Sequence, residues 1–108
     1  MAIGETSGRT IPPIEHEPGE KRGRWVMRIE GADAADEPEM TYRHVGAHTI
    51  SIDHTGVPPR FEGRGYGSAL VERGVADARA KGWRIVPACP FVAVKFHRHP
   101  EWADVLAE

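Results

Sequence analysis

The chain has 108 residues, enough for one domain with a hydrophobic core of its own. Its formal net charge of -2 argues against a protein that binds nucleic acid mainly through its charge. A single cysteine excludes an intramolecular disulfide and no apolar run approaches the roughly 20 residues of a membrane span, so we expect a cytoplasmic protein with neither nucleic acid nor a membrane as partner.

The N-terminal half alternates polar and apolar residues in the manner of antiparallel strands. Residues 1–13 are polar and end in a proline pair, so we expect a flexible tail followed by one domain over residues 14–108. Within that domain the alternation predicts strands at 14–16, 24–30, 39–44 and 49–54. The first half is therefore predicted to be an antiparallel meander.

The second half changes to the period of a helix. From Gly65 onward, apolar residues recur at the spacing of one helix face. A strand is expected at 83–86, which should leave its neighbour or lie at a sheet edge because Pro87 cannot donate to a ladder. A shorter helix is predicted over 91–99, with a last helical turn at 101–106. This order predicts an α/β fold of the α+β type, a mixed sheet with one central helix.

The stretch RFEGRGYGSAL, residues 60–70, places three glycines at alternate positions just before the central helix. A helix start leaves backbone N–H groups unpaired and carries about half a positive charge, so it suits an anion such as a pyrophosphate. Arg64 would add a cation and Ser68 a hydroxyl donor. The spacing excludes both the P-loop and the G-x-G-x-x-G dinucleotide fingerprint. Spacing alone leaves two interpretations open, an anion site or a glycine-rich turn without a ligand.

Four motifs occur in a fixed order along the chain. They are DHTGVP at 53–58, GRGYGSAL at 63–70, VPACPFV at 86–92 and RHPEW at 98–102. In this combination the chain closely resembles the small YjdJ-type members of the GNAT N-acetyltransferase superfamily, from about residue 14 to the C-terminus. The resemblance implies a mainly antiparallel sheet with a short C-terminal helix. It also implies acetyl-CoA as co-substrate, bound at a V-shaped gap between two splayed strands, and no metal.

In this superfamily the backbone amides of an R/Q-x-x-G-x-G/A motif hold the CoA pyrophosphate. Carried over, the motif begins at Glu62, where the family has Arg or Gln, and places Gly65 and Gly67 at the glycine positions. A second register begins at Arg60 and uses Gly63, but it starts the helix too early. Glu62 would repel a pyrophosphate unless it points away or pairs with a neighbouring arginine. The residues expected at the cofactor site are Val57, Arg64, Gly65, Tyr66, Gly67, Ser68 and Phe91.

Two residues beside the expected gap are candidates for the chemistry. His54 ends the strand that enters the gap, and an imidazole suits a general base at neutral pH. Cys89 lies on the other side and can protonate the departing CoA thiolate or accept the acetyl group as a nucleophile, activated by His54 if the two meet. Each also has a structural interpretation, as a hydrogen-bonded histidine and as a small buried hydrophobe. Four other histidines lack the spacing of metal ligands, so we expect them on the solvated surface. They are His44, His48, His97 and His99.

The leading functional hypothesis is an enzyme that moves an acetyl group from acetyl-CoA to a primary amine in a ternary complex. The acceptor would be a small molecule or a peptide, and the protein would be a monomer or weak dimer. The alternative is a CoA-binding module with little or no turnover, because a chain of 108 residues leaves little material for an acceptor pocket. A third hypothesis is a protein-interaction domain with an empty glycine turn.

Overall fold

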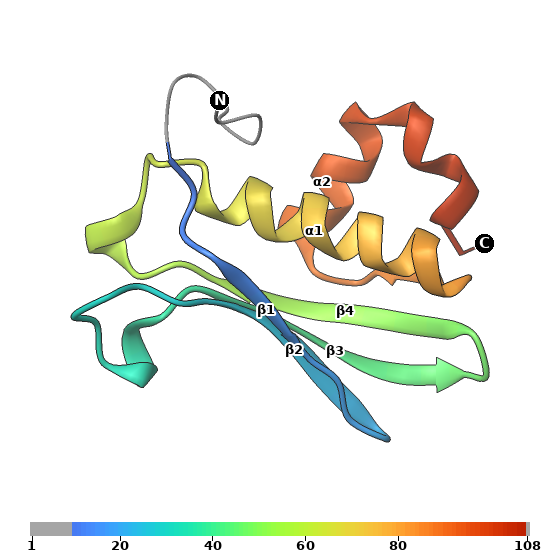
Figure 1. Cartoon of the computed structure of the whole chain (residues 1–108). Coiled ribbons are helices and arrows are strands. Elements are labelled where there is room, and N and C mark those ends of the chain that lie inside the picture. Colours follow the sequence, from blue (N-terminus) through green and yellow to red (C-terminus); the bar gives the residue numbers. More distant parts are fainter. Residues whose placement is uncertain (1–9, 108) are drawn as a thin grey trace.

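The structure is a computed structural model that describes residues 10–107 of the chain. Over this part of the chain, five strands form one sheet in sequential order, with three antiparallel pairings followed by one parallel pairing (Figure 1). The strands are β1 (Ile14–Glu17), β2 (Arg22–Met27), β3 (Glu39–Gly46), β4 (Thr49–Gly56) and β5 (Arg84–Pro87). The helices are α1 (Tyr66–Lys81) and α2 (Pro90–Arg98), with 3-10 helices at Ala34–Asp36, Pro59–Phe61 and Pro100–Val105. The predicted mixed, mainly antiparallel sheet with a central helix is confirmed.

Several predicted element boundaries differ from the structure, and β3 and β4 each end two residues later than expected. The strand expected at 24–30 begins two residues earlier, as β2, and ends at Met27. The chain turns shortly after β2, and the backbone N–H of Ala32 donates to the carbonyl of Ile29 at 3.1 Å in this turn. The last helical turn is present, but as the 3-10 helix Pro100–Val105.

The expected tail, residues 1–13, is covered by the structure only in part. Residues 1–9 lie outside the described residues. Ile11 packs against the hydrophobic core, and the carbonyl of Pro13 accepts a 2.8 Å hydrogen bond from the backbone of Arg28. The chain is therefore in contact with the domain shortly before β1 begins.

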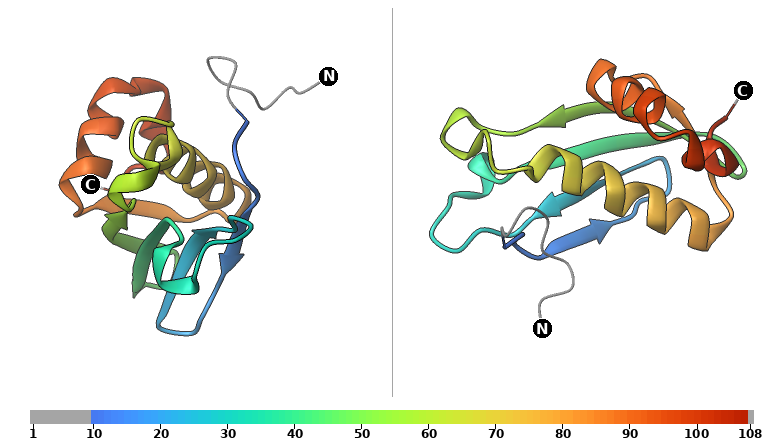
Figure 2. Two further views of the ribbon diagram at one scale, coloured as in Figure 1. Left: turned by 90° about the vertical axis from the view of Figure 1, so that its left-hand side faces the viewer. Right: turned by 90° about the horizontal axis from the view of Figure 1, so that it is seen from above.

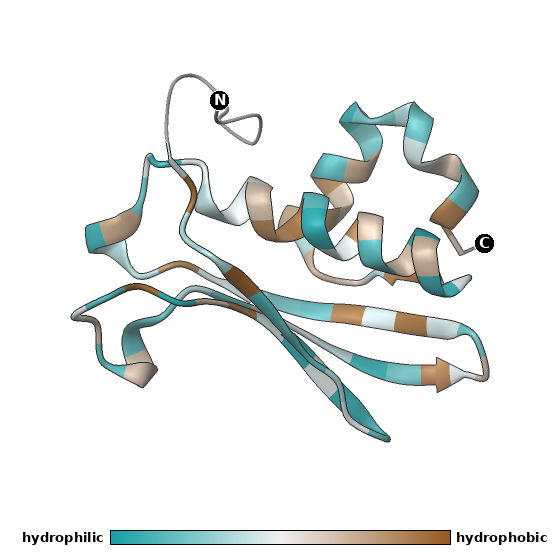
Figure 3. Cartoon of the chain, viewed as in Figure 1, coloured by the Kyte–Doolittle hydropathy of each residue, from teal (hydrophilic) through white to brown (hydrophobic). Residues whose placement is uncertain are grey.

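Both helices cover one face of the sheet (Figure 2). Helix α1 packs its apolar side against the strands, and its residues Leu70, Val71 and Ala78 are fully buried. It also approaches the sheet closely, because a Cβ added to Gly74 would lie 2.7 Å from Cε of Met40. Apolar and polar bands alternate along β4 (Figure 3), as a strand with one covered face requires. None of the helices within residues 10–107 combines the length and apolar character needed to cross a bilayer.

The sheet face opposite the helices carries charged side chains that pair across strands. Arg24 contacts Glu17 at 2.7 Å and Glu39 at 2.8 Å, and Arg43 contacts Asp53 at 3.0 Å. These groups are partly exposed, so each pair stabilises the fold by about 1 kcal/mol or less. The charges named on this polar face are therefore balanced by one another and lie outside the core.

An aromatic cluster joins strands β1, β2 and β3 to Trp83, which lies between α1 and β5. It consists of His16, Trp25, Tyr42, His44 and Trp83. The His16 ring stacks on Trp25 with centroids 4.7 Å apart and shares a 2.8 Å hydrogen bond with the Tyr42 hydroxyl. Aromatic pairs of this kind stabilise a protein beyond the area they bury.

Two histidines expected on the solvated surface are instead half-buried in aromatic contacts. His44 lies edge-on to Trp83 with centroids 5.2 Å apart. His99 stacks on Trp102 with centroids 4.1 Å apart. The contact of His44 joins segments distant in sequence, which spacing along the chain does not reveal, whereas the contact of His99 is local and forms where α2 ends.

Burial affects the protonation of His16. Removal from water lowers the pKa of the imidazole below its usual value, because the charged form loses its hydration. The carboxylate of Asp77 opposes this effect, whereas Lys81, Arg73 and His44 add to it. The folded state therefore binds a proton at His16 less readily than the unfolded chain does.

We expect His16 to make the fold less stable in mild acid. The stability that neutral His16 contributes is fully present above the unfolded pKa of about 6.5 and is lost as the pH falls through the lower folded value. Urea unfolding between pH 7.5 and pH 5 should show this loss in the wild type and a shallower loss in His16→Gln. His48→Gln, at an exposed position, should follow the wild type. Equal slopes for all three proteins would contradict the assignment.

Candidate active site

Strands β4 and β5 pair over a short stretch and then part. Their parallel pairing ends at Ile52 and Pro87, whereas β4 continues along β3 as far as Gly56. The predicted departure of the strand at Pro87 is confirmed, since β5 is the edge strand and ends there. Cys89 lies at this fork, where its backbone N–H donates to the carbonyl of Ile52 at 2.9 Å.

The glycine-rich loop is anchored to the core by two aromatic side chains. Phe61 and Tyr66 are each 8% exposed, and their ring centroids lie 6.1 Å apart. Between them Gly63 and Gly65 have φ angles of 80° and 79°, a left-handed conformation that strains other residues. Gly65 is the N-cap of α1 and has no side chain to cap the helix. The first N–H groups of α1 are thus left for water or a ligand.

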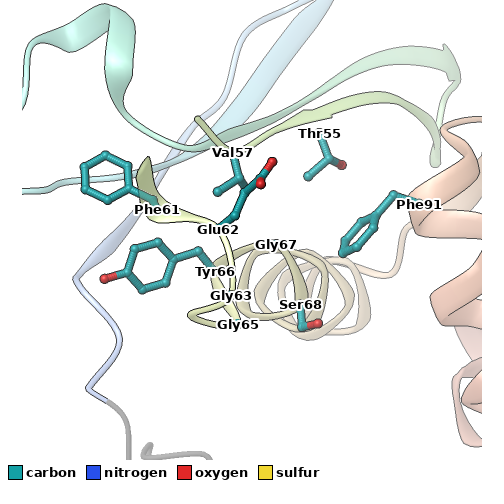
Figure 4. Close-up of a pocket in the computed structure, with 10 residues that line it drawn as sticks. All are labelled: Thr55, Val57, Phe61, Glu62, Gly63, Gly65, Tyr66, Gly67, Ser68 and Phe91. Atoms are coloured by element: carbon teal, nitrogen blue, oxygen red, sulfur yellow. The ribbon is translucent and has the colours of Figure 1, made fainter. Parts of the chain in front are cut away.

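A pocket of about 380 Å³ lies between the end of β4, the glycine-rich loop and the first turn of α2 (Figure 4). Ligand pockets in proteins are typically of about this size or larger. Six of the seven residues expected at the cofactor site line it, namely Val57, Gly65, Tyr66, Gly67, Ser68 and Phe91. The start of α1, with its positive dipole end, therefore forms one wall of the pocket.

Gly67 and Phe91 lie against each other inside this pocket. A Cβ added to Gly67 would lie 2.9 Å from the Phe91 ring. Gly67 thus makes room for an aromatic side chain, whereas Gly65 meets the backbone requirement of the N-cap. Phe91 is 40% exposed, an unusual state for a phenyl ring, and offers an apolar surface to a ligand.

Arg64, the seventh expected cofactor residue, does not line this pocket. It lies at an adjoining hollow together with Thr10, Gly63 and Tyr66. Its guanidinium is 5.7 Å from the centroid of the Phe61 ring. The side chain is exposed and lies outside the pocket in this structure.

The two candidate catalytic residues are not brought into direct contact. Cys89 is buried behind the pocket, with its Sγ 3.7 Å from the hydroxyl oxygen of Thr55, which lines it. His54 is exposed and pairs with Thr41, whereas Thr55 pairs with the buried Met40. His54 therefore lies on the polar face of β4, and Thr55 lies on the face that the helices cover.

Four residues that line the pocket were not among the expected cofactor residues, namely Thr55, Phe61, Glu62 and Gly63. Phe61 gave a usable signal as an isolated apolar residue in a polar loop. Thr55 gave none, because a β-bulge at Asp53 decides which face it occupies. Glu62 was recognised as a departure from the family motif, but its orientation could not be known.

No group of three or more His, Cys, Asp or Glu side chains gathers in a metal-binding arrangement within residues 10–107. The residues that line the pocket offer backbone amides, hydroxyls and the carboxylate of Glu62, and the thiol of Cys89 lies behind Thr55. Together they can bind an anion at the start of α1 and place a thioester or a similar group near the fork.

Residues 24–105 match a family model described as GCN5-related N-acetyl-transferase. Because this match covers most of the chain, the chain belongs to the GCN5-related N-acetyltransferase family. A protein from Staphylococcus aureus, solved by NMR in solution and described as GCN5-like, superimposes with a TM-score of 0.67 and 31% identity, over 86% of this chain and 87% of that one. The mixed sheet with its helices is thus the acetyltransferase fold.

Vertebrate relatives share parts of the sequence. Protein NATD1 of Xenopus tropicalis is 34% identical over 59 residues, which are 55% of this chain and 50% of that protein. Protein NATD1 of Gallus gallus is 32% identical over 60 residues, 56% of this chain and 53% of that protein. Protein NATD1 of Danio rerio is 25% identical over 93 residues, 84% of this chain and 81% of that protein. The matched segment spans about half the length of the first two relatives.

Proposed function

We propose that the chain is a cytoplasmic N-acetyltransferase of the small YjdJ-type group, which transfers the acetyl group of acetyl-CoA to an amine. The observation that carries this proposal is the position of the pocket. It has the start of α1 at one end and, through Thr55, leads to the thiol of Cys89 at the fork between β4 and β5. Acetyl-CoA is an extended ligand with an anionic pyrophosphate and, further along, a thioester. The start of α1 would bind the pyrophosphate, and the thioester would lie near the thiol of Cys89.

On the donor side, the backbone amides at the start of α1 would hold the pyrophosphate of acetyl-CoA, with Ser68 adding a hydroxyl donor. Val57 and Phe91 offer apolar contacts to the pantetheine arm. The acetyl thioester would then lie near Thr55, at the point where the two strands part.

On the acceptor side, the polar face of the sheet can receive a cationic amine. β4 continues past the last residue that pairs with β5, so an amine arriving from the polar face and a thioester arriving from the pocket can meet at this edge. His54 lies on the polar side of this edge and would take the proton of the attacking amine. Asp53, its neighbour on the same strand, is ion-paired with Arg43 at 3.0 Å, so an amine would have to compete with that guanidinium for the carboxylate.

Cys89 can act in two ways, as the acid that protonates CoA or as a nucleophile that carries the acetyl group. In direct transfer the amine nitrogen bonds to the acetyl carbon and gives its proton to His54, the bond from that carbon to the CoA sulfur breaks, and the thiol of Cys89 protonates the departing CoA thiolate. Water then takes the proton from His54 and returns one to Cys89. In the covalent route the sulfur of Cys89 takes the acetyl group first and its proton goes to CoA. The amine then releases the acetyl group from Cys89 and restores the thiol.

A CoA-binding module without turnover is the alternative that the structure favours next. The catalytic candidates His54 and Cys89 are separated by the sheet, and Cys89 is 6% exposed. Such a module would bind acetyl-CoA in the same pocket but would not release free CoA when amines are added.

We expect acetyl-CoA to stabilise the protein. At 100 times the dissociation constant a ligand adds about 2.7 kcal/mol, which raises the melting temperature of a domain of this size by roughly 10–20 °C. A thermal-shift titration tests this, and the absence of any shift at millimolar acetyl-CoA would contradict both the enzyme and the module. Release of free CoA thiol in a screen of peptides, polyamines and small amines then separates the two.

A further inference from the structure

Glu62 brings a negative charge to a pocket proposed to hold an anion. It immediately precedes Gly63 in the loop and lines the pocket with the first turn of α1. In Figure 4 its side chain rises from the loop towards Val57 and Thr55, so the carboxylate points into the pocket rather than away from it. The side chain is also exposed, so its orientation is not forced by burial.

Neither of the two arginines beside Glu62 forms an ion pair with it in this structure. Arg60 contacts Asp36 at 3.3 Å and lies 4.7 Å from the centroid of the Phe61 ring. Arg64 lies over the same ring at 5.7 Å. Within the described part of the chain, the Glu62 carboxylate has no ion pair, so its charge faces the pocket uncompensated.

This charge acts differently on the two parts of a CoA ligand. A diphosphate near the start of α1 carries negative charge and is repelled by a carboxylate that lines the same pocket. The pantetheine arm is neutral and meets no such penalty. For the diphosphate, the start of α1 therefore favours binding and the carboxylate of Glu62 opposes it within the same pocket.

We propose that Glu62 is a specificity-determining residue that weakens binding of the diphosphate of CoA relative to the neutral pantetheine arm. This inference rests on the proposed function, because it concerns the same pocket and the same donor. The carboxylate of Glu62 would then limit how tightly acetyl-CoA binds and would speed the release of CoA after transfer. Most of the effect should lie in the dissociation rate, as is usual for changes at one interface.

The test compares Glu62→Gln with the wild type and with Glu72→Gln, an exposed position of α1 outside the pocket. NMR titrations with acetyl-CoA and with pantetheine cover both tight and weak binding. At low salt, Glu62→Gln should bind acetyl-CoA about three- to tenfold more tightly than the wild type, as expected for unit charges a few ångströms apart in a solvated site. Pantetheine should bind all three proteins within about twofold. The gain should shrink in about 0.5 M NaCl, because salt screens exposed charges.

A merely structural role for Glu62 would give a different pattern. Equal or weaker binding of acetyl-CoA by Glu62→Gln would overturn the inference while leaving the proposed function intact. An equal gain for acetyl-CoA and pantetheine would also overturn it, because shape rather than charge would then be responsible. If neither wild type nor Glu62→Gln bound acetyl-CoA, the proposed function would fail and this inference with it.

Discussion

Replacing Cys89 by serine is expected to lower the rate of acetyl transfer to an amine by about a hundredfold or more, the usual size of a lost proton-transfer or nucleophilic group. Serine keeps the small size of the buried side chain, and its hydroxyl can still reach Thr55. It is a far weaker acid and nucleophile than a thiol at neutral pH. Steady-state release of free CoA, measured with an amine found in the acceptor screen, gives the rate.

Controls separate this effect from damage to the fold. Cys89→Ser should bind acetyl-CoA within about twofold of the wild type and should melt within a few degrees of it, because Cys89 does not line the pocket. Val94→Ala, at an exposed position of α2, should retain the rate. Normal turnover by Cys89→Ser would show that the thiol serves only packing.

Intact mass distinguishes the two routes through Cys89. Wild-type protein mixed with acetyl-CoA in the absence of an amine should carry an acetyl adduct if the sulfur is a nucleophile. The adduct should be absent from Cys89→Ser. A lost rate without an adduct in the wild type would identify the thiol as the acid that protonates CoA.

The place of His54 shows where sequence reasoning reaches its limit. The alternation of Ile50 and Ile52 is plain in the sequence, and strict alternation would put residue 54 on the face that the helices cover. The pairing with β3 instead shifts by one residue, so that His54 opposes Thr41 while Ile52 opposes Tyr42. A one-residue shift moves every later side chain to the other face. No residue type marks the bulge, so Thr55 could not be predicted in the pocket.

Features set by backbone chemistry were easier to predict. Proline has no N–H, and β5 ends at Pro87 as expected. The central helix was expected from about Gly65, and Gly65 is its N-cap. The contact between Gly67 and Phe91 depends on how α1 and α2 meet, which requires the tertiary structure. Local backbone geometry could therefore be predicted from the sequence, whereas contacts between distant segments could not.

The role of a glycine in the middle of β2 also depends on contacts between distant segments, and the sequence does not predict it. Gly23 lies directly opposite Tyr42 on β3, in a strand position where glycine is usually unfavourable. A Cβ added there would lie 2.3 Å from the Tyr42 hydroxyl oxygen and 2.9 Å from the backbone carbonyl of Glu17. Gly23 thus leaves the space in which Tyr42 lies and reaches His16.

We therefore expect Gly23→Ala to destabilise the fold by about 3 kcal/mol, at the upper end of the range for overpacking a buried site. Neither neighbour can yield easily, because Tyr42 is 2% exposed and the carbonyl of Glu17 belongs to the adjoining strand. Urea unfolding should show a lower midpoint with an unchanged slope, and the melting temperature should fall by roughly 10–20 °C.

Gly46→Ala is the matched control, since a Cβ there would meet only Thr49 at an ordinary 3.5 Å. Its stability should stay within about 0.5 kcal/mol of the wild type. The double variant Gly23→Ala with Tyr42→Ala should lose less than the sum of the single changes, because removing the ring also removes the clash. Strict additivity would mean that the added methyl acts on the backbone of β1 rather than on Tyr42, and the aromatic cluster would then not depend on Gly23.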